Sequence, residues 1–245
     1  MPQRASYTKA LVTGATSGLG KELASLLKQK GIEVLETGRT GTPPLDLTKR
    51  EERAALLEII THEVPDLIIN SAGFGLYGSA IDLSTKEQLE MIELNCSALV
   101  EISLHSARTL IKNGKKGTLL NLSSSGAFFP FPTFNIYCAS KAFVNSFSLA
   151  LDTELKEKGV RVLCACPGQV ATDFRNRSSK GHPQKKDRRT MPVKQAALHI
   201  WKQIEKEKTL YIFDWRTRMM LTLAKFLPRA LLEKIMIQSI ADRYS

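Results

Sequence analysis

Tyr137 and Lys141 are the residues whose types and spacing point most directly to chemistry. Of the five tyrosines in the chain, only Tyr137 is followed by a lysine four residues later. On a helix this spacing places both side chains on one face, so that both can reach one ligand. The pair is therefore our candidate reactive centre.

The pair suits proton transfer. A free phenol titrates at about pH 10, and a neighbouring ammonium favours the phenolate. Lowering the pKa of Tyr137 by about three units requires roughly 4 kcal/mol, which a partly desolvated pair can supply. We therefore expect Tyr137 to protonate a nascent alkoxide, or to take the proton in the reverse direction.

A glycine-rich turn near the N-terminus predicts a phosphate site. The run Thr13–Gly20 lies between an apolar run, Lys9–Thr13, and a segment with helical spacing, Gly18–Lys30. Glycines let the backbone approach a pyrophosphate, and a helix N-terminus supplies free N–H groups and partial positive charge. The G-x3-G-x-G spacing alone is a weak signal, but its place between the first strand and the first helix makes it strong.

Short β-rich runs alternate with longer helical patterns along the chain, which is typical of right-handed βαβ units. Ser84 with Glu87 is typical of a capping box, and Gly159 of a helix C-cap. We expect one domain over residues 1–245, a doubly wound, Rossmann-type α/β fold whose parallel sheet of about seven strands has helices on both faces and a helical C-terminal appendage. The expected strands are Lys9–Thr13, Ile32–Thr37, Asp66–Asn70, Gly117–Ser123, Val160–Cys166 and Thr209–Phe213, and the expected helices Gly18–Lys30, Thr48–His62, Ser84–Lys112, Ile136–Lys158 and Pro192–Glu207.

Five motifs in order resemble those of the short-chain dehydrogenase/reductase family, over about residues 8–213. Thr13–Gly20 resembles its T-G-x3-G-x-G cofactor loop, and Asn70–Gly73 its N-N-A-G segment, with Ser71 in place of the second asparagine. Asn95 matches its mid-helix asparagine, and Ser124, Tyr137 and Lys141 its serine, tyrosine and lysine. Pro167, Gly168 and Thr172 match its P-G-x3-T segment. A surface tyrosine and a strand-end turn would explain any one of these residues, but not the ordered set.

The resemblance implies hydride transfer between a nicotinamide cofactor and a carbonyl or secondary alcohol. It implies that Lys141 also binds the nicotinamide ribose, that Ser124 polarises the carbonyl, and that Asn95 holds a water linking Lys141 to solvent. Ser123 and Ser125 flank the site, but the thirteen-residue spacing to Tyr137 selects Ser124. No metal is implied. The other implied cofactor contacts are Gly14, Thr16, Ser17, Gly18, Leu19, Gly20, Asp46, Leu47, Asn70, Ala72, Gly73, Pro167, Gly168, Val170 and Thr172.

The end of the second expected strand predicts the cofactor. A site that prefers NAD places a carboxylate there, to accept a hydrogen bond from the ribose 2′-OH. Here Gly38 takes that place and Arg39 follows, whose guanidinium suits a 2′-phosphate. Glu36 favours NAD, but two residues earlier it should lie within the strand. We expect NADP(H) rather than NAD(H), with Arg39 as a ligand.

The same region departs from the family pattern. Only Thr40–Leu45 separates Arg39 from Asp46, whereas a crossover needs about a dozen residues. We expect the family's helix at this point to be missing and the third strand to be a short stub around Leu45–Leu47. By resemblance Asp46 and Leu47 still flank the adenine, in a pocket that is open on that side and leaves Arg39 mobile without a ligand.

Two basic stretches carry most of the net charge of +11. Residues 173–190, which cover the substrate in the family, either recruit an anionic or carrier-bound substrate or form a disordered loop. Residues 215–245 form either a helical flap or subunit contact, broken at Pro228, or a basic amphipathic helix on an anionic membrane. Some of the aromatic residues between Ser124 and Tyr137 should be core, and two or so should line an apolar pocket mouth. These are Phe128, Phe129, Phe131 and Phe134.

The remaining features concern compartment, rivals and assembly. The absence of a long apolar stretch or a signal-peptide pattern predicts a cytoplasmic protein, in which Cys164 and Cys166 are reduced core thiols rather than a metal or redox pair. A non-catalytic NADP-binding regulatory protein is the alternative, although such proteins typically lose the tyrosine or lysine. We expect no nucleic-acid binding, because Arg175–Arg189 lacks a recognition helix or interleaved aromatics. By resemblance, the two long helices predict a homodimer or homotetramer.

Overall fold

The computed structural model describes residues 7–41, 43–180 and 190–224. In this part of the chain six parallel strands form one sheet in the order β2-β1-β3-β4-β5-β6. The strands are β1 (Lys9–Thr13), β2 (Glu33–Thr37), β3 (Leu67–Asn70), β4 (Gly117–Leu122), β5 (Val160–Cys166) and β6 (Leu210–Ile212). The chain runs outward from β1 to β2 and then returns to the other side of β1, which leaves a crevice at the carboxyl ends of β1 and β3.

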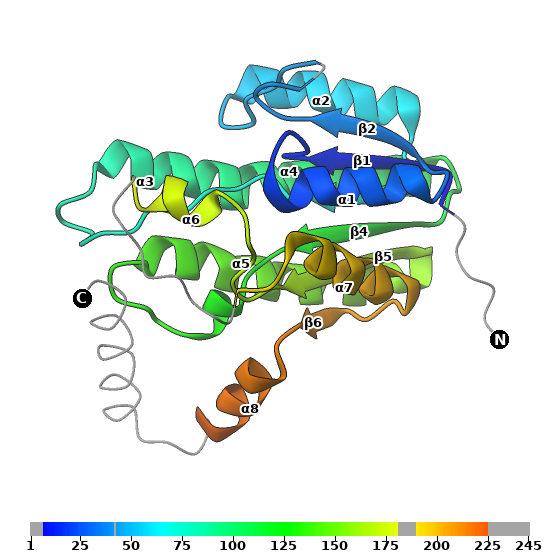
Figure 1. Cartoon of the computed structure of the whole chain (residues 1–245). Coiled ribbons are helices and arrows are strands. Elements are labelled where there is room, and N and C mark those ends of the chain that lie inside the picture. The colour runs from blue at the N-terminus through cyan, green and yellow to red at the C-terminus, as the bar shows by residue number, and fades with distance from the viewer. Residues whose placement is uncertain (1–6, 42, 181–189, 225–245) are drawn as a thin grey trace.

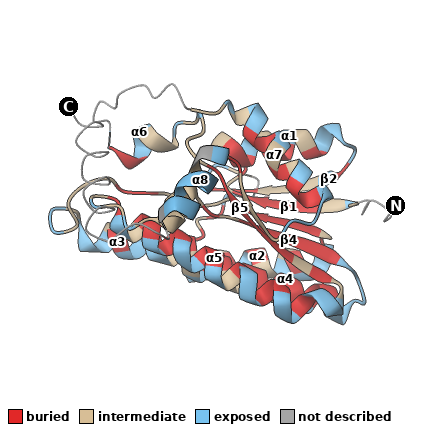
Figure 2. Cartoon of the chain, turned by 90° about the horizontal axis from the view of Figure 1, so that it is seen from below, coloured by how far each residue is buried: buried red, intermediate tan, exposed pale blue. Residues whose placement is uncertain are grey.

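Helices cover both faces of the sheet, so the expected doubly wound, Rossmann-type fold is confirmed (Figure 1). One apolar core joins α1 (Gly18–Gln29) and α7 (Val193–Glu205) to the sheet. A second core on the opposite face joins α2 (Arg50–Glu63), α4 (Leu99–Lys112) and α5 (Asn135–Leu155). In Figure 2 the central strands and the sheet-facing sides of these helices are buried, and the outer sides of the helices are exposed. The edge strands β2 and β6 are mostly half-buried. This burial follows from strands of nearly continuous apolar residues, as expected of a two-sided parallel sheet.

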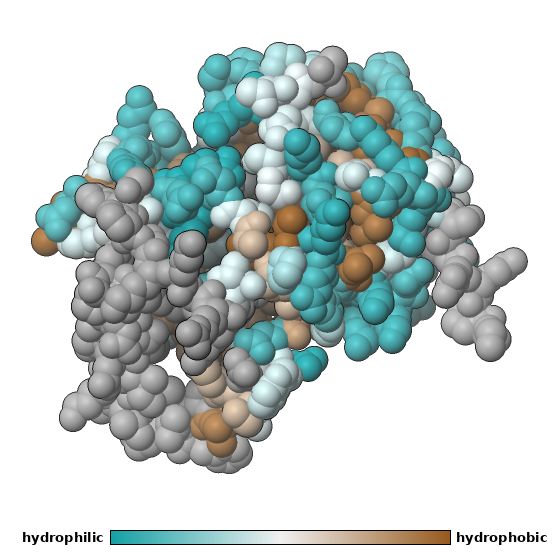
Figure 3. Space-filling model, in the orientation of Figure 1, coloured by the Kyte–Doolittle hydropathy of each residue, from teal (hydrophilic) through white to brown (hydrophobic). Residues whose placement is uncertain are grey.

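Two short helices lie beyond the carboxyl ends of the strands, at the same end of the molecule (Figure 1). They are α3 (Thr85–Ile92) and α6 (Phe174–Ser178). The surface in Figure 3 is dominated by hydrophilic residues, with hydrophobic residues showing in small patches. The two helices α3 and α6 thus border the crevice at the strand ends without covering a face of the sheet.

The expected helix Ser84–Lys112 is interrupted. It consists of α3, a π-helix at Glu93–Ala98 and then α4. The expected capping box is wrong, because the Ser84 side chain makes no cap hydrogen bond and Glu87 instead pairs with Lys180 of the segment after α6. Gly159 does end the long α5 region, with φ of +79° in the left-handed conformation.

The expected third strand around Leu45–Leu47 is also wrong. Only an isolated bridge joins Gly38 to Pro44, and Leu45 donates a hydrogen bond to the Gly38 carbonyl. The chain then turns, because the Asp46 carboxylate accepts from both the backbone and the hydroxyl of Thr48. Residues 43–47 contain no helix, as expected, while Leu45 and Leu47 are buried.

The C-terminal appendage begins with α8 (Trp215–Ala224). The helix expected after Pro228 lies outside the described residues. Residues 181–189 of the basic stretch 173–190 also lie outside them. In the described ranges, no helix combines the length and the apolarity needed to cross a membrane.

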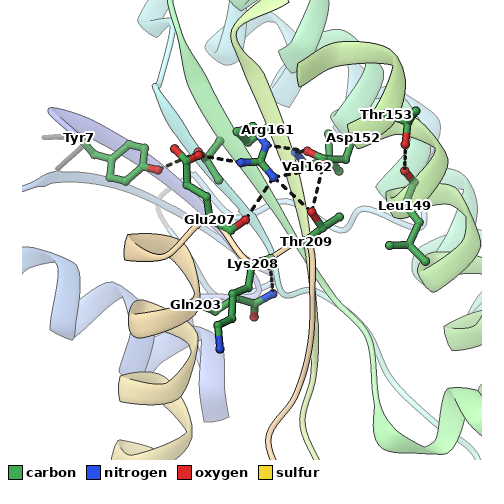
Figure 4. Close-up of polar contacts among 11 residues, drawn as sticks. Tyr7, Leu149, Asp152, Thr153, Arg161, Val162, Gln203, Glu207, Lys208 and Thr209 are labelled. Atoms are coloured by element: carbon green, nitrogen blue, oxygen red, sulfur yellow. Dashed lines mark hydrogen bonds and ion pairs between the residues drawn. The ribbon is translucent and has the colours of Figure 1, made fainter. Parts of the chain in front are cut away.

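A polar network fixes the end of the sheet opposite the crevice (Figure 4). Arg161 of β5 pairs with the buried Asp152 of α5 at 3.0 Å and with Glu207 at 2.7 Å. Asp152 also accepts from the backbone of Val162 and from the Thr209 hydroxyl. The network ties α5 to β5 and to the start of β6.

The cysteines of β5 are part of the core. Cys164 and Cys166 are fully buried, and both thiols lie within hydrogen-bond distance of the Asn145 side-chain oxygen. The expectation that they lie in the core is confirmed, and all four cysteines of the chain are free thiols.

Candidate active site

A cleft of about 1420 Å³ opens at the carboxyl ends of the strands. It runs from the glycine turn after β1 to the N-terminal part of α5. Its lining contains every predicted site residue except Asn70 and Asn95, which are buried beside it. Predicted site residues as distant in sequence as Gly14 and Thr172 therefore share one cavity.

The glycine turn is packed too tightly for side chains. Gly14 has φ of +67°, and a Cβ there would lie 2.9 Å from the Ala72 Cα atom. A Cβ on Gly20 would lie 2.3 Å from the Gly14 carbonyl oxygen. The Thr13 hydroxyl accepts from the backbone N–H groups of Ser71 and Ala72, which holds the turn against the end of β3. The turn is thus a rigid backbone cradle at the N-terminus of α1.

Arg177 reaches this cradle from α6, although the sequence placed it only within the basic stretch at 173–190. Its Nη2 atom lies 3.4 Å from the Ser17 hydroxyl, which is free to bind elsewhere because it does not cap α1. Asp173 lies 3.6 Å from the Arg177 Nε atom. A guanidinium beside the positive end of a helix is favourable when an anion lies between them.

Asn70 supports the strands rather than lining the cleft. Its amide nitrogen donates to the Ser103 hydroxyl at 3.0 Å and to the Asn121 side chain at 2.9 Å. Asn121 in turn donates to Ser148. This buried chain of amides and hydroxyls links β3 and β4 to α4 and α5.

Asn95 lies in the π-helix, and its side-chain amide is held by the backbone N–H and C=O groups of Phe74. It donates to the Phe74 carbonyl at 2.9 Å and accepts from the Phe74 N–H at 3.2 Å. It also donates to the Ser140 hydroxyl. A Cβ on Gly73 would lie 2.9 Å from the Asn95 oxygen and 3.5 Å from Lys141 Nζ, so only the width of a glycine separates the two side chains. Such π-helical turns are frequent at functional sites.

Ser124, Tyr137 and Lys141 meet in the cleft. Tyr137 and Lys141 are both buried on α5, and Lys141 Nζ lies 5.8 Å from the centre of the Tyr137 ring. The Ser124 side chain hydrogen-bonds the Tyr137 phenol and accepts from the Gly126 N–H at 3.0 Å. The neighbouring Ser123 hydroxyl instead donates to the Lys141 carbonyl. The adjacent serines therefore differ in their contacts, and Ser124 is the one that faces the Tyr137 phenol.

The electrostatics of this trio differ from the expectation. Burial raises the pKa of the Tyr137 phenol, while the hydrogen bond with Ser124 acts in the opposite direction. Burial also lowers the pKa of Lys141 to about 8. The prediction that Lys141 lowers the phenol pKa is wrong for the polypeptide itself, because Nζ donates to the Leu122 carbonyl at 2.8 Å and desolvation dominates both groups.

Aromatic rings surround the phenol. Phe134 stacks on Tyr77 at 3.8 Å between ring centres and on Tyr137 at 4.2 Å. Phe174 of α6 is tilted against Tyr137 at 5.5 Å. Of the four phenylalanines between Ser124 and Tyr137, Phe131 and Phe134 line the cleft, as expected of two of them. Tyr77 and Phe174 were not predicted, because they come from segments distant in sequence.

The far end of the cleft is formed by the region that lacks the family's helix. Gly38, the exposed Arg39, Asp46 and Leu47 line it. Burial raises the pKa of Asp46, but the Thr48 hydrogen bonds and the nearby Arg39 charge outweigh it and keep that pKa below its ordinary value. Glu36 pairs with Lys28 within the strand, so its carboxylate is not directed to this end.

A buried arginine supports this end, and sequence reasoning missed it. Arg53 of α2 donates to the Leu47 carbonyl at 3.0 Å and to the Thr48 carbonyl at 3.3 Å. Its other nitrogens pair with Glu93 and Glu101, both at 2.7 Å. The turn at Leu47 is thereby anchored to the helix that carries Asn95.

Comparisons with known proteins agree with this arrangement. Residues 8–183 match the family described as short chain dehydrogenase. Serine 3-dehydrogenase from Agrobacterium fabrum is 33% identical over 182 residues, which are 67% of this chain and 72% of that protein. The chain therefore belongs to the short-chain dehydrogenase family.

Solved structures share the fold. A short-chain dehydrogenase from Sphingobium yanoikuyae in complex with NADPH superposes with a TM-score of 0.76 at 22% identity, covering 91% of this chain and 97% of the other. A 4-hydroxyisoleucine dehydrogenase complexed with NADH gives a TM-score of 0.74 at 19% identity, covering 84% and 97%. Nicotinamide cofactors of both kinds are thus bound on this fold.

Proposed function

We propose that the chain is an NADP(H)-dependent oxidoreductase that transfers a hydride between nicotinamide and a carbonyl or secondary alcohol. One observation carries the proposal. Ser124, Tyr137 and Lys141 converge in the cleft that the glycine cradle also lines. The cradle fits a dinucleotide, since Gly14 and Gly20 leave no room for side chains and α1 begins at Gly18 with its N–H groups free for phosphate.

Each residue of the trio has a role that its position supports. The bound cofactor supplies or accepts the hydride. The Ser124 hydroxyl donates to the carbonyl oxygen of the substrate and polarises it. Tyr137 then gives its phenolic proton to that oxygen. Because burial raises the phenol pKa, Tyr137 is protonated at neutral pH and is suited to act as the acid in carbonyl reduction.

Lys141 and Asn95 complete the proposed site. The Lys141 ammonium binds the nicotinamide ribose and stabilises the phenolate left after proton transfer. Asn95, fixed by Phe74, holds a water through which the proton is replaced. The proximity of Asn95 and Lys141 across Gly73 supports this relay.

The preference for NADP(H) rests on the end of β2. A side chain on Gly38 would begin 2.9 Å from the Thr16 hydroxyl, so the position that holds the carboxylate of an NAD site has no room for one. Arg39, next to it, is exposed on the cleft and offers its guanidinium to a 2′-phosphate. Glu36, the feature that favoured NAD, is paired with Lys28.

The proposal extends to assembly and compartment. Exposed apolar side chains on α4 and α5, among them Ile111, Phe143 and Leu149, support a subunit interface on these helices and hence a homodimer or homotetramer. The four free thiols support a reducing compartment such as the cytoplasm. The alternative is a regulatory protein that binds the cofactor without turning over a substrate.

The direct test is a Tyr137→Phe variant. We expect it to bind NADPH as the wild type does and to lose carbonyl reduction by about 1000-fold, since proton donation contributes about 10²- to 10⁴-fold. NADPH oxidation by a panel of ketones and aldehydes measures turnover, and fluorescence titration measures binding. Wild-type turnover in the variant would refute the role of Tyr137. Cofactor binding without turnover of any carbonyl by the wild type would favour the regulatory alternative.

A further inference from the structure

We infer that the substrate is an uncharged aromatic carbonyl compound, such as an aryl ketone or aryl aldehyde. The inference rests on the proposed oxidoreductase function and names the class of substrate that reaches Tyr137. It comes from the side chains that line the end of the cleft around the phenol.

Three separate segments bring aromatic rings to that end. Phe74 and Tyr77 follow β3, Phe131 and Phe134 precede α5, and Phe174 opens α6; all five line the cleft. With Leu76 they form one apolar cluster around Tyr137. The Phe74, Tyr77, Phe131 and Phe174 side chains belong to half-buried residues, so apolar ring surface remains open to a ligand.

The packing of the rings favours a flat ligand. Tyr77 and Phe134 are nearly parallel, with 10° between their planes, and Phe134 and Tyr137 differ by 23°. A Cβ on Gly75 would lie 2.8 Å from Phe134 and 3.1 Å from Phe174, so these two rings rest directly on backbone and cannot shift toward it. Stacked and edge-to-face contacts with such fixed rings stabilise another aromatic ring beyond the effect of area alone.

The cations that the structure describes around this end already have partners, which disfavours an anionic substrate. Lys180 is paired with Glu87 at 2.8 Å, and Arg177 lies between Asp173 and Ser17. Glu90 adds a second carboxylate to the lining beside Glu87. Lys141 is turned to the Leu122 carbonyl. Arg175 also lines the cleft and has contacts of its own. A substrate carboxylate or sulfonate next to the reacting carbonyl would therefore lose its hydration and compete for cations that already have partners.

The inference separates this chain from the relative named a serine 3-dehydrogenase, whose named substrate is small and zwitterionic. Shared motifs hold the cofactor and the reacting carbonyl. The aromatic cluster instead decides which groups can flank that carbonyl. We therefore expect specificity to follow the rings and not the level of identity.

Steady-state kinetics with the purified full chain tests the inference. With NADPH, the carbonyl substrates are acetophenone, benzaldehyde and glyoxylate; with NADP⁺, the alcohols are 1-phenylethanol and serine. We expect kcat/KM for the aryl compounds to exceed that for glyoxylate and serine by about 100-fold or more, because charged groups are costly in an apolar site. A preference for glyoxylate or serine would overturn the substrate class and leave the proposed function intact.

Variants of Phe174 locate the effect. Phe174→Ala should lower kcat/KM for acetophenone about tenfold, mainly through KM, whereas Phe174→Tyr retains the ring and the activity. Leu198→Ala, on the outer side of α7 and not in the cleft lining, is the control and should change nothing. Equal activity of Phe174→Ala and the wild type toward acetophenone would contradict the inference.

A binding measurement keeps the two proposals distinguishable. Acetophenone is titrated calorimetrically into protein loaded with NADP⁺, a complex in which no turnover occurs. Binding that weakens in Phe174→Ala supports the aromatic site even if the chain reduces no carbonyl, an outcome that would defeat only the proposed function. If the chain neither binds nor turns over any aryl compound, the inference is overturned.

Discussion

The Nζ atom of Lys141 donates a 2.8 Å hydrogen bond to the backbone carbonyl of Leu122, the last residue of β4. Two residues later the same strand end presents Ser124, whose hydroxyl contacts the Tyr137 phenol. One strand terminus therefore sets the positions of both groups that flank the phenol. The effect of Lys141 on stability and the effect of Ser124 on activity can therefore be measured separately.

Burial of Lys141 should make stability rise with pH in the alkaline range. Its pKa is about 8 in the folded chain, against about 10.4 for an ordinary lysine. Between these values the unfolded chain binds more protons, so the free energy of unfolding increases with pH, by about 2 kcal/mol from pH 7.5 to 9.5. Urea unfolding at both pH values measures it. A Lys141→Met variant should lack this increment, and an identical pH dependence in both proteins would contradict the prediction.

Removal of the Ser124 hydroxyl should affect both rate and pH profile. The hydrogen bond with Ser124 lowers the Tyr137 pKa against the effect of burial, so Ser124→Ala should raise that pKa further. The pH limb of kcat/KM that reports Tyr137 should move to higher pH, and kcat should fall about 100-fold with the loss of one donor to the carbonyl. Ser25→Ala, exposed on α1, is the control. An unmoved limb would mean that Ser124 does not act on the phenol.

Arg39 should distinguish the two cofactors. A charge-assisted hydrogen bond contributes about 1.5 to 3 kcal/mol, so Arg39→Gln should weaken NADPH binding by about tenfold or more. NADH, which lacks the 2′-phosphate, should bind to the variant and to the wild type equally well. Dissociation constants from fluorescence titration measure both. Equal losses for NADPH and NADH would show that Arg39 does not read the 2′-phosphate.

Arg177 should act on both cofactors alike. Its guanidinium lies against Ser17 of the glycine cradle, which we propose to hold the pyrophosphate common to NADPH and NADH. Arg177→Gln should weaken the two by a similar factor of about three to ten, because the arginine is half-exposed and its charge is partly screened. Arg39→Gln serves as the contrasting variant. A loss confined to NADPH would place Arg177 at the 2′-phosphate instead.

Asp152 should matter for stability and not for cofactor binding. Burial raises its pKa, but the Arg161 ion pair and the hydrogen bonds from Val162 and Thr209 outweigh it, so the net pKa is lowered. Its contribution is therefore present above the ordinary carboxyl range and is lost as the pH falls through the lowered value. Asp152→Asn should cost about 3 kcal/mol at pH 7, as broken buried pairs do, and less at pH 3.

The control for this prediction is Asp82→Asn, an exposed aspartate outside the network. Urea unfolding at both pH values measures the free energies, and NADPH titration measures the site. An equal loss in the two variants, or a weaker NADPH affinity in Asp152→Asn alone, would show that the network does not act as a purely structural tie at the far end of the sheet.

Local pattern was sufficient to predict most of the fold. Apolar runs and helical spacing placed β1, α1 and β5 to within a residue or two, since such periods encode which face of an element is buried. Pattern failed where a local signal competed with tertiary contacts. Ser84 and Glu87 resemble a capping box, but Glu87 pairs with Lys180, and the stub at Leu45–Leu47 is replaced by a turn held by Thr48 and Arg53.

By itself the sequence determined that Tyr137 and Lys141, the proposed reactive pair, share one face of a helix, because a spacing of four residues fixes that face. Only the tertiary structure decided what surrounds them. Phe134 and Phe174 reach the phenol from different segments, Asn70 is directed into the core, and burial rather than Lys141 sets the direction of the phenol pKa shift. Desolvation and contacts between distant segments depend on how the layers pack, and no local spacing encodes that packing.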